Sequence, residues 1–186
     1  MELWDIYDVH RNKKGKTMQR GGTFEQGDYH LVVHICVFNS KNEMLIQQRQ
    51  ANKIGFPNRW DFTAGGSATS GDTSQSAAER ELFEEIGLRV DMQHKRPQLT
   101  INYDFGFDDI YLIEQNVEIE SLILQKEEVQ AVRWASCEEI LHMIAEEEFV
   151  PYYPSVVELL FQSRKKFGML MHLDESKTKK SDKKLR

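Results

Sequence analysis

The sequence predicts an α+β fold in which a mixed β-sheet lies between helices, in an α/β/α arrangement. Three observations support this prediction. Strand-like segments fill the first part of the chain and begin with a hairpin, helical patterns are interspersed later, and the two do not alternate strictly as in a parallel α/β protein. The length of 186 residues suits one domain.

The chain opens with a strand and a hairpin. Residues 3–9 alternate apolar and polar side chains, and residues 11–15 have the composition of a turn. We therefore expect a hairpin extension at 1–27, the main domain at 28–170 and a basic flexible tail at 171–186.

Two strands follow the hairpin. Residues 31–38 are apolar on both faces and rich in β-branched side chains, which predicts a strand in the middle of a sheet. After a turn at 39–42, residues 44–49 form a second strand that ends in polar side chains. A polar end is expected where a sheet meets a cleft, so Arg49 is a candidate binding residue.

The clearest helical pattern covers residues 73–86, after a loop that contains residues 55–57 and 60 and a polar loop at 67–72. Asp72 is the expected N-cap and Gly87 the expected end of this helix. Its apolar stripe, which should pack on the sheet, consists of Ala77, Ala78, Leu82 and Ile86.

The remaining chain predicts three more strands and two more helices. Ser136 should cap the first of these helices, and Pro151 and Pro154 should break the chain before the second. The strands are expected at 98–103, 109–119 and 129–134, and the helices at 136–147 and 155–167.

Composition and charge exclude several classes of protein. No apolar run reaches the roughly 18 residues that cross a bilayer, and the N-terminus lacks a signal pattern, so we expect a cytoplasmic protein without a membrane partner. Cys36 and Cys137 lie far apart in apolar surroundings, which favours buried thiols over a disulfide or a zinc site.

The net charge of −6 is unevenly distributed along the chain. Residues 176–186 contain six Lys or Arg and one Asp, so the rest of the chain carries −11. An acidic body without a basic stripe disfavours a nucleic-acid polymer as partner. The basic tail is expected to be solvated.

Three carboxylates share one face of the predicted helix at 73–86. At about 100° per residue, Glu81 and Glu85 lie about 40° apart and Glu84 about 60° to the other side of Glu81. Like charges at this spacing weaken a helix unless a cation neutralises them. Oxygen ligands without a nearby Cys favour Mg²⁺, with Mn²⁺ as a substitute. The alternative is a solvated acidic face in which Arg80 pairs with Glu84.

The spacing of this segment decides between the two interpretations. From Gly66 to Leu88 it has the form G-x5-D-x7-R-E-L-x-E-E-x-G-L and resembles the Nudix box, which has Glu where this chain has Asp72. By chance, the six matching Gly, Arg and Glu positions would coincide at about one start in 10⁷. The resemblance extends over roughly residues 28–150.

The resemblance implies a Nudix-type α/β/α sandwich and a Mg²⁺-dependent hydrolase that cleaves the diphosphate linkage of a small-molecule substrate. It assigns metal binding to Glu81, Glu84 and Glu85, and catalysis to Glu81, Glu84 and Glu128, with Glu127 as a rival to Glu128. Arg80 orients the carboxylates and Asp72 braces the loop. Substrate binding falls to Arg49, Gly65 and Gly66, although Arg49 is equally well interpreted as part of a surface ion pair.

Two other functions are weighed. The N-terminal segment and His30 are similar to isopentenyl-diphosphate isomerases, but those enzymes have a Cys where this chain has Gly65 and a His where it has Ser67, so the proton donor is missing. A non-catalytic nucleotide or metabolite sensor would not need the full carboxylate cluster. His30 and His34 are interpreted as structural, with His34 a hydrogen-bonded core residue.

The organic group on the diphosphate is not specified by the sequence. Four aromatic residues are candidates for stacking on a base or for packing: Tyr7, Phe56, Trp60 and Tyr103. The hairpin and the aromatic run at 149–153 are candidate surfaces for a homodimer.

Overall fold

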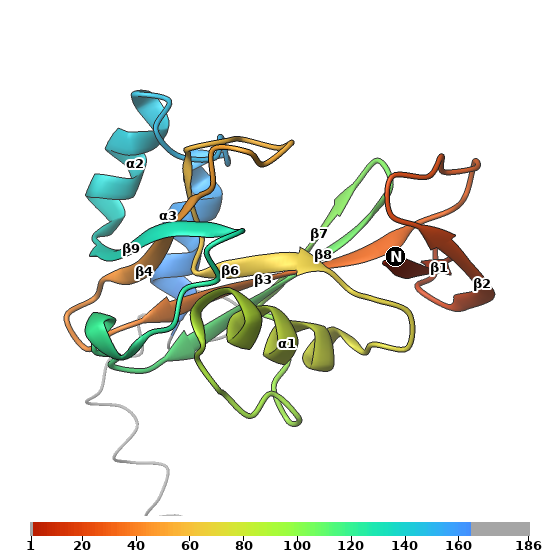
Figure 1. Cartoon of the computed structure of the whole chain (residues 1–186), viewed down its shortest axis with the longest axis horizontal. Coiled ribbons are helices and arrows are strands. Elements are labelled where there is room, and N and C mark those ends of the chain that lie inside the picture. The colour runs from red at the N-terminus through yellow and green to blue at the C-terminus, as the bar shows by residue number, and fades with distance from the viewer. Residues whose placement is uncertain (1, 165–186) are drawn as a thin grey trace, which may run out of the picture.

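The computed structural model describes residues 2–164 (Figure 1). The basic tail at 171–186 lies outside the described residues. No helix in the described part of the chain is both long and apolar enough to cross a membrane. The strands are β1 (Leu3–Tyr7), β2 (Lys13–Gln19), β3 (His30–Phe38), β4 (Met44–Arg49), β5 (Trp60–Asp61), β6 (Ala64–Ser67), β7 (Leu99–Tyr103), β8 (Gly106–Glu114) and β9 (Val129–Ala135). The helices are α1 (Ser74–Ile86), α2 (Cys137–Ala145) and α3 (Pro154–Ser163), with a 3₁₀ turn at Ile119–Ser121.

The main sheet is mixed and is built around β3. This strand pairs in parallel with β8 along its full length, and antiparallel with β6 at its start and β4 at its end. β4 also pairs with β5 and β9, and β7 closes the other edge beside β8. The side chains of β3 are buried on both faces of the sheet, as the apolar sequence at 31–38 predicts.

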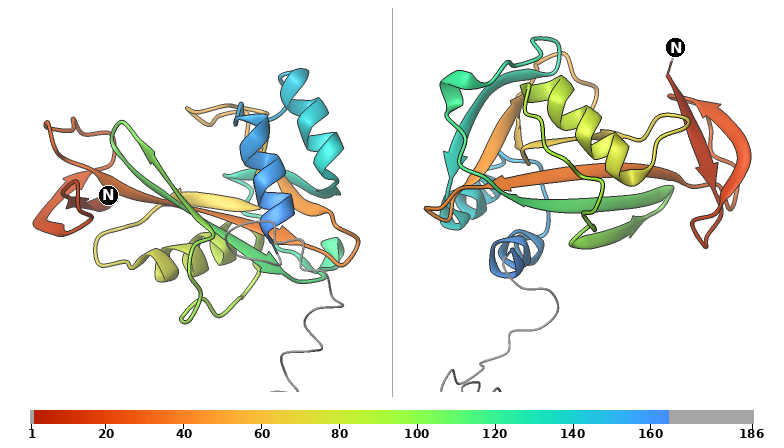
Figure 2. Two further views of the ribbon diagram at one scale, coloured as in Figure 1. Left: turned by 180° about the vertical axis from the view of Figure 1, so that it is seen from behind. Right: turned by 90° about the horizontal axis from the view of Figure 1, so that it is seen from below.

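Helices cover both faces of this sheet, which confirms the α/β/α prediction. The apolar stripe of α1 packs on one face, in a core that contains Val33, Ile35 and Tyr111. α2 and α3 pack on the opposite face, in a second core around Phe38 and Phe62. Figure 2 shows the sheet between α1 and the α2–α3 pair.

The predicted N-terminal hairpin forms and docks on the loop before α1. β1 pairs antiparallel with β2. The backbone N–H of Ser70 donates to the Leu3 carbonyl at 2.7 Å. Asp5 accepts from the Ser70 hydroxyl at 2.8 Å and from the Gly71 N–H at 3.0 Å. On the other side, Arg11 donates two bonds to the buried Asp109, at 3.0 and 2.7 Å.

Several local predictions are wrong. Thr73, and not Asp72, is the N-cap of α1, because the Asp72 carboxylate is already occupied by other donors. The strand expected at 109–119 ends at Glu114, because its partner β3 ends at Phe38. The two expected loops overlap short strands at their ends, since β5 begins at Trp60 and β6 ends at Ser67, and both strands are too short to show a pattern.

The C-terminal helices start close to their predicted positions. Ser136 caps α2 as expected. Pro154 begins α3 instead of preceding it, since proline fits the first turn of a helix. Phe149 and Val150 are buried, so the exposed part of the aromatic run at 149–153 is mainly Tyr153.

Candidate functional site

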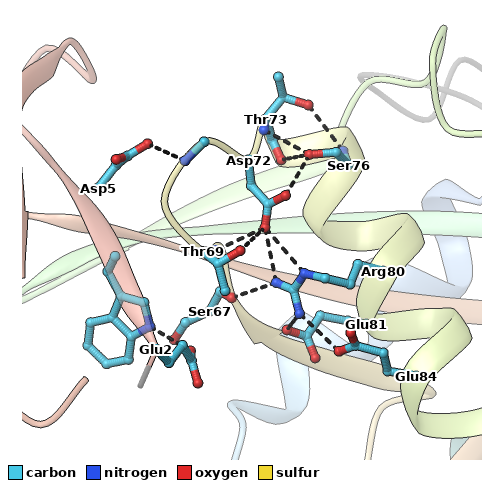
Figure 3. Close-up of polar contacts among 12 residues, drawn as sticks. Glu2, Asp5, Ser67, Thr69, Asp72, Thr73, Ser76, Arg80, Glu81 and Glu84 are labelled. Carbon is cyan, nitrogen blue, oxygen red and sulfur yellow. Dashed lines mark hydrogen bonds and ion pairs between the residues drawn. The ribbon is translucent and has the colours of Figure 1, made fainter. Parts of the chain in front are cut away.

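The caps of α1 fix where the helix begins and where it ends. Thr73 and Ser76 form a reciprocal capping box, and Gly87 ends the helix in the left-handed region at φ 73°. With the apolar stripe on the sheet, Arg80, Glu81 and Glu84 gather beside the loop before the helix (Figure 3), and Glu85 is among the buried residues of α1.

Arg80 holds this loop against the helix. Its guanidinium donates to Asp72 at 3.1 Å and to the Ser67 carbonyl at 3.0 Å. It also donates to Glu81 at 2.7 Å and to Glu84 at 3.1 Å (Figure 3). Burial lowers the pKa of Arg80, but Glu81 and Asp72 outweigh it and keep the guanidinium charged. The pair with Glu84 expected for a solvated face is present, yet it is one part of a larger network.

The Asp72 carboxylate accepts hydrogen bonds from several neighbouring residues. It accepts from the backbone N–H and the hydroxyl of Thr69, both at 2.9 Å, and from the Ser76 hydroxyl at 2.9 Å. Burial raises the pKa of Asp72, but these hydrogen bonds and Arg80 outweigh it and lower the pKa below its usual value. Asp72 thus braces the loop with a shorter side chain than the Glu of the box pattern.

Glu85 is the most buried of the three carboxylates. It accepts from the Gln47 amide at 2.8 Å and from the Gly65 N–H at 3.1 Å. Burial raises the pKa of Glu85 to about 8, and the neighbouring Glu81 charge adds to the shift. Burial also raises the pKa of Glu81.

At positions 65 and 66 neighbouring side chains lie so close to the backbone that only glycine fits. A Cβ at position 66 would lie 2.5 Å from the Glu81 carboxyl carbon, and one at position 65 would overlap the His34 ring. Gly66 therefore lets β6 lie directly against Glu81, and Gly65 lets it lie against the His34 ring of β3.

The carboxylates line a cleft made of two adjoining cavities. The inner cavity, of about 340 Å³, contains Glu81, Glu84, Glu85 and Glu128. The outer cavity, of about 580 Å³, contains Arg49 and Glu127. The residues that line both cavities mark the junction between them and are Arg20, Lys53, Gly65, Gly66, Ser67, Glu85 and Glu128.

The predicted site residues from distant segments thus meet at one cleft. Glu128 forms an ion pair with Lys53, whereas Glu127 lines only the outer cavity. Arg49 donates to Asp61 at 3.1 Å and to the Gly55 carbonyl at 3.0 Å. The surface ion pair considered for Arg49 is therefore present, within the cleft wall.

Four residues in or next to the cleft were not predicted from the sequence. Arg20 and Lys53 line its cavities, whereas Gln47 contacts Glu85 and Asp108 contacts His34. Gln47 belongs to the polar end of β4, which is a signal that sequence analysis could have used. Arg20, Lys53 and Asp108 show no local motif. Asp108 accepts from the Nδ1 of His34 at 2.8 Å, and although burial lowers the pKa of His34, Asp108 outweighs it and raises that pKa to about 9.

His30 faces the hairpin and not the cleft. Its ring stacks on Trp4, with centroids 4.4 Å apart, and burial lowers its pKa to about 4. Its structural interpretation agrees with this environment. None of the candidate stacking residues lines the cleft within the described chain: Tyr7, Phe56, Trp60 and Tyr103.

The donors of the cleft fit a hard divalent cation. Within residues 2–164 no three acidic, His or Cys side chains are arranged as a finished metal site. Arg80 bridges Glu81 and Glu84, and Lys53 holds Glu128. Burial raises the pKa of Glu85 and the Glu81 charge adds to this shift, and a divalent cation would favour the charged form of both carboxylates.

Comparisons with known proteins agree with this geometry. The family model of the NUDIX domain matches residues 28–159. A Listeria monocytogenes protein described as an uncharacterized Nudix hydrolase is 44% identical over 82% of this chain and 90% of its own length. The isopentenyl-diphosphate Delta-isomerase of Pectobacterium atrosepticum is 27% identical over 82% of this chain and 89% of its own length. A crystal structure of a Deinococcus radiodurans protein covers 87% of this chain and 98% of its own, at a TM-score of 0.70 and 23% identity, which shows the fold.

Proposed function

The chain belongs to the Nudix family and is a hydrolase acting on pyrophosphate bonds, and from this premise we propose that it uses water and Mg²⁺ to cleave the diphosphate linkage of a nucleoside diphosphate derivative or another organic diphosphate. The observation that supports the proposal best is the meeting of four carboxylates and two close-packed glycines at one cleft. The predicted cytoplasmic location and homodimer stay predictions.

In this proposal, the helix face and the loop at 125–128 divide the work. Glu81, Glu84 and Glu85 hold the cation, and Mn²⁺ can replace Mg²⁺. When bound, the cation supplies charge neutralisation for the phosphate oxygens and a lowered pKa for the attacking water. Arg80 and Asp72 keep Glu81, Glu84 and the loop in register, which their hydrogen bonds support.

The other residues bind the substrate and move its proton. Glu128 accepts the proton of the attacking water, while Glu81 and Glu84 orient the reacting groups. Gly65 and Gly66 line both cavities and present the backbone of β6 to the diphosphate, and Arg49 contributes positive charge from the outer cavity.

For the isomerase alternative, the cleft that residues 2–164 form lacks a cysteine that could donate the proton. Cys36 is fully buried, and neither Cys36 nor Cys137 lines the cleft in the described part of the chain. A double-bond shift needs a proton donor beside the substrate carbon. The similarity to the isomerase of Pectobacterium atrosepticum therefore supports isoprenoid diphosphates as members of a substrate panel more than it supports their isomerisation.

A panel of diphosphate compounds tests the proposal. Phosphate and nucleotide release is measured for nucleotide sugars, dinucleotides, oxidised nucleotides and prenyl diphosphates, with Mg²⁺ and with chelator, in the wild type and in Glu85→Gln. Turnover that needs the metal and is lost in the variant supports the hydrolase. Tight binding of a panel member without turnover would favour the sensor instead.

A further inference from the structure

Two cations stand at the junction of the inner and outer cavities. Arg20 directly follows β2 of the hairpin, and Lys53 lies in the loop between β4 and β5. Both side chains line both cavities, together with Glu85 and Glu128. A diphosphate bound at this junction would lie beside both cations and both carboxylates.

Arg20 is held by a single carboxylate, that of the half-buried Glu2. Its Nη1 donates to Glu2 at 2.8 Å, and its backbone N–H donates to the Glu2 carbonyl at 3.0 Å. The Arg20 side chain is 59% exposed. Arg20 lines the inner cavity together with Glu81 and Glu128, and its pKa is raised, mainly by the hydrogen bond to Glu2. Most of its donors remain available to a ligand.

Lys53 has one carboxylate partner, and that partner has a role in the proposed reaction. Its Nζ pairs with Glu128, and its side chain is 19% exposed. The other two cations of the cleft differ. Arg80 is shared among four acceptors, and Arg49 is fixed by Asp61 and the Gly55 carbonyl.

We propose that Arg20 and Lys53 form a phosphate clamp at this junction. Phosphate oxygens of the substrate replace Glu2 as the partner of Arg20 and Glu128 as the partner of Lys53, because both cations bind phosphate through charge-assisted hydrogen bonds. Releasing Glu128 from Lys53 couples phosphate binding to the availability of the proton acceptor. The clamp rests on the proposed function, since a diphosphate is its ligand, and it makes the hairpin part of the site.

Calorimetric titration with imidodiphosphate, a non-hydrolysable diphosphate, tests the clamp in the full chain with Mg²⁺. The variants are Arg20→Gln and Lys53→Gln, and Lys16→Gln is the control. Lys16 is a hairpin cation that pairs with Glu25 and Asp28 away from the cleft. We expect the Kd to rise about 5- to 20-fold in each clamp variant, and to stay within about twofold in the control.

Glu2→Gln sharpens the test because its expected effect has the opposite sign. Removing the competing carboxylate frees Arg20, so the Kd should fall about two- to fivefold, and by less when Arg20→Gln is also present. The double variant separates two effects of Glu2→Gln. Release of Arg20 needs Arg20 to be present, whereas weaker repulsion between Glu2 and the diphosphate does not.

The outcomes for the clamp and for the hydrolase are distinct. An unchanged Kd in Arg20→Gln or Lys53→Gln, equal loss in the control, or no binding to the wild type overturns the clamp, even if the panel shows turnover. Binding that depends on both cations, in a protein that turns over no panel member, supports the clamp and argues against the hydrolase. If Arg20→Gln lowers the thermal midpoint, Arg20→Lys and Lys53→Gln supply the comparison.

Discussion

The acidic and basic sides of the cleft are built in different ways. The acidic wall comes mainly from one helix, where Glu81, Glu84 and Glu85 lie within five positions. The basic side draws Arg20, Arg49 and Lys53 from the hairpin, the end of β4 and the following loop. The carboxylates proposed to hold the cation are therefore neighbours in the sequence, whereas Glu128 and the cations proposed to contact the substrate come together only in the fold.

Glu85→Gln should give the largest effect, because it removes a proposed metal ligand from the acidic wall. We expect kcat to fall about 10³-fold, with the unfolding midpoint kept, since the amide oxygen can still accept from Gln47. Glu79→Gln is the matched control on the same helix. Glu79 accepts from the Met92 N–H on another face of α1. Equal loss in both variants would show that helix stability, and not the cleft, carries the effect.

Arg80→Lys should give the second-largest loss of activity. A lysine is unable to bridge Asp72, Glu81, Glu84 and the Ser67 carbonyl at once, so the carboxylates lose their common brace. We expect kcat/KM to fall about 30- to 100-fold at saturating Mg²⁺. Activity within threefold of the wild type would remove Arg80 from the acidic wall and leave it a charge on the helix surface.

His34→Gln tests whether the His34 side chain, which lines the outer cavity, makes the stability of the protein depend on pH. The folded pKa of His34, about 9, is above its unfolded value of 6.5, so its stabilisation is complete below pH 6.5 and is lost as the pH rises through about 9. The charged groups acting on it are Asp108, Asp61 and Glu85, and Tyr152 contacts its ring.

Urea unfolding from pH 6 to pH 10 measures this effect. The stability advantage of the wild type over His34→Gln should shrink by about 2 kcal/mol across that range. His10→Gln, at an exposed hairpin residue, is the control and should run parallel to the wild type. Parallel curves for all three proteins would contradict a charged His34.

Arg49→Gln should have a modest effect that falls on binding. Because Asp61 and the Gly55 carbonyl already hold Arg49, we expect KM to rise about three- to tenfold, with kcat within twofold. Steady-state kinetics over a range of substrate concentrations separates the two constants. A loss in kcat alone would mean that Arg49 acts on the reacting groups, and the division between the two sides of the cleft would then fail.

Asp72→Glu should change least. The substitution restores the box residue but adds a methylene to a carboxylate that already has donors from Thr69, Ser76 and Arg80. We expect turnover within threefold and a thermal midpoint lower by about 2 °C. A large gain in activity would show that the shorter Asp72 limits the acidic wall.

The sequence was most informative where the pattern is local. The stripe that begins at Ala77 and the end at Gly87 place α1, and the spacing after Gly66 places the carboxylates on one of its faces. The buried strand at 31–38 and the Ser136 cap were likewise predictable, because each depends on a few neighbouring residues.

Features that depend on distant partners were missed or misplaced. Asp is a residue type that is favoured at N-caps. In the fold, however, Arg80 and Ser76 donate hydrogen bonds to the Asp72 carboxylate, and Thr73 is the N-cap of α1. The end of β8 is set by the length of β3, which no window around residue 114 contains. Arg20 reaches the cleft only because the hairpin docks on the loop at 67–72.

The parallel pairing of β3 with β8 also has a consequence for biosynthesis. The two strands form the centre of the sheet, yet β4, β5, β6, α1 and β7 are synthesised between them. A ribosome therefore releases β3 with one long apolar edge unpaired, and the edge stays open until residue 114 has emerged. The β1–β2 hairpin and α1 can form early from local contacts, whereas the sheet centre must wait for most of the chain.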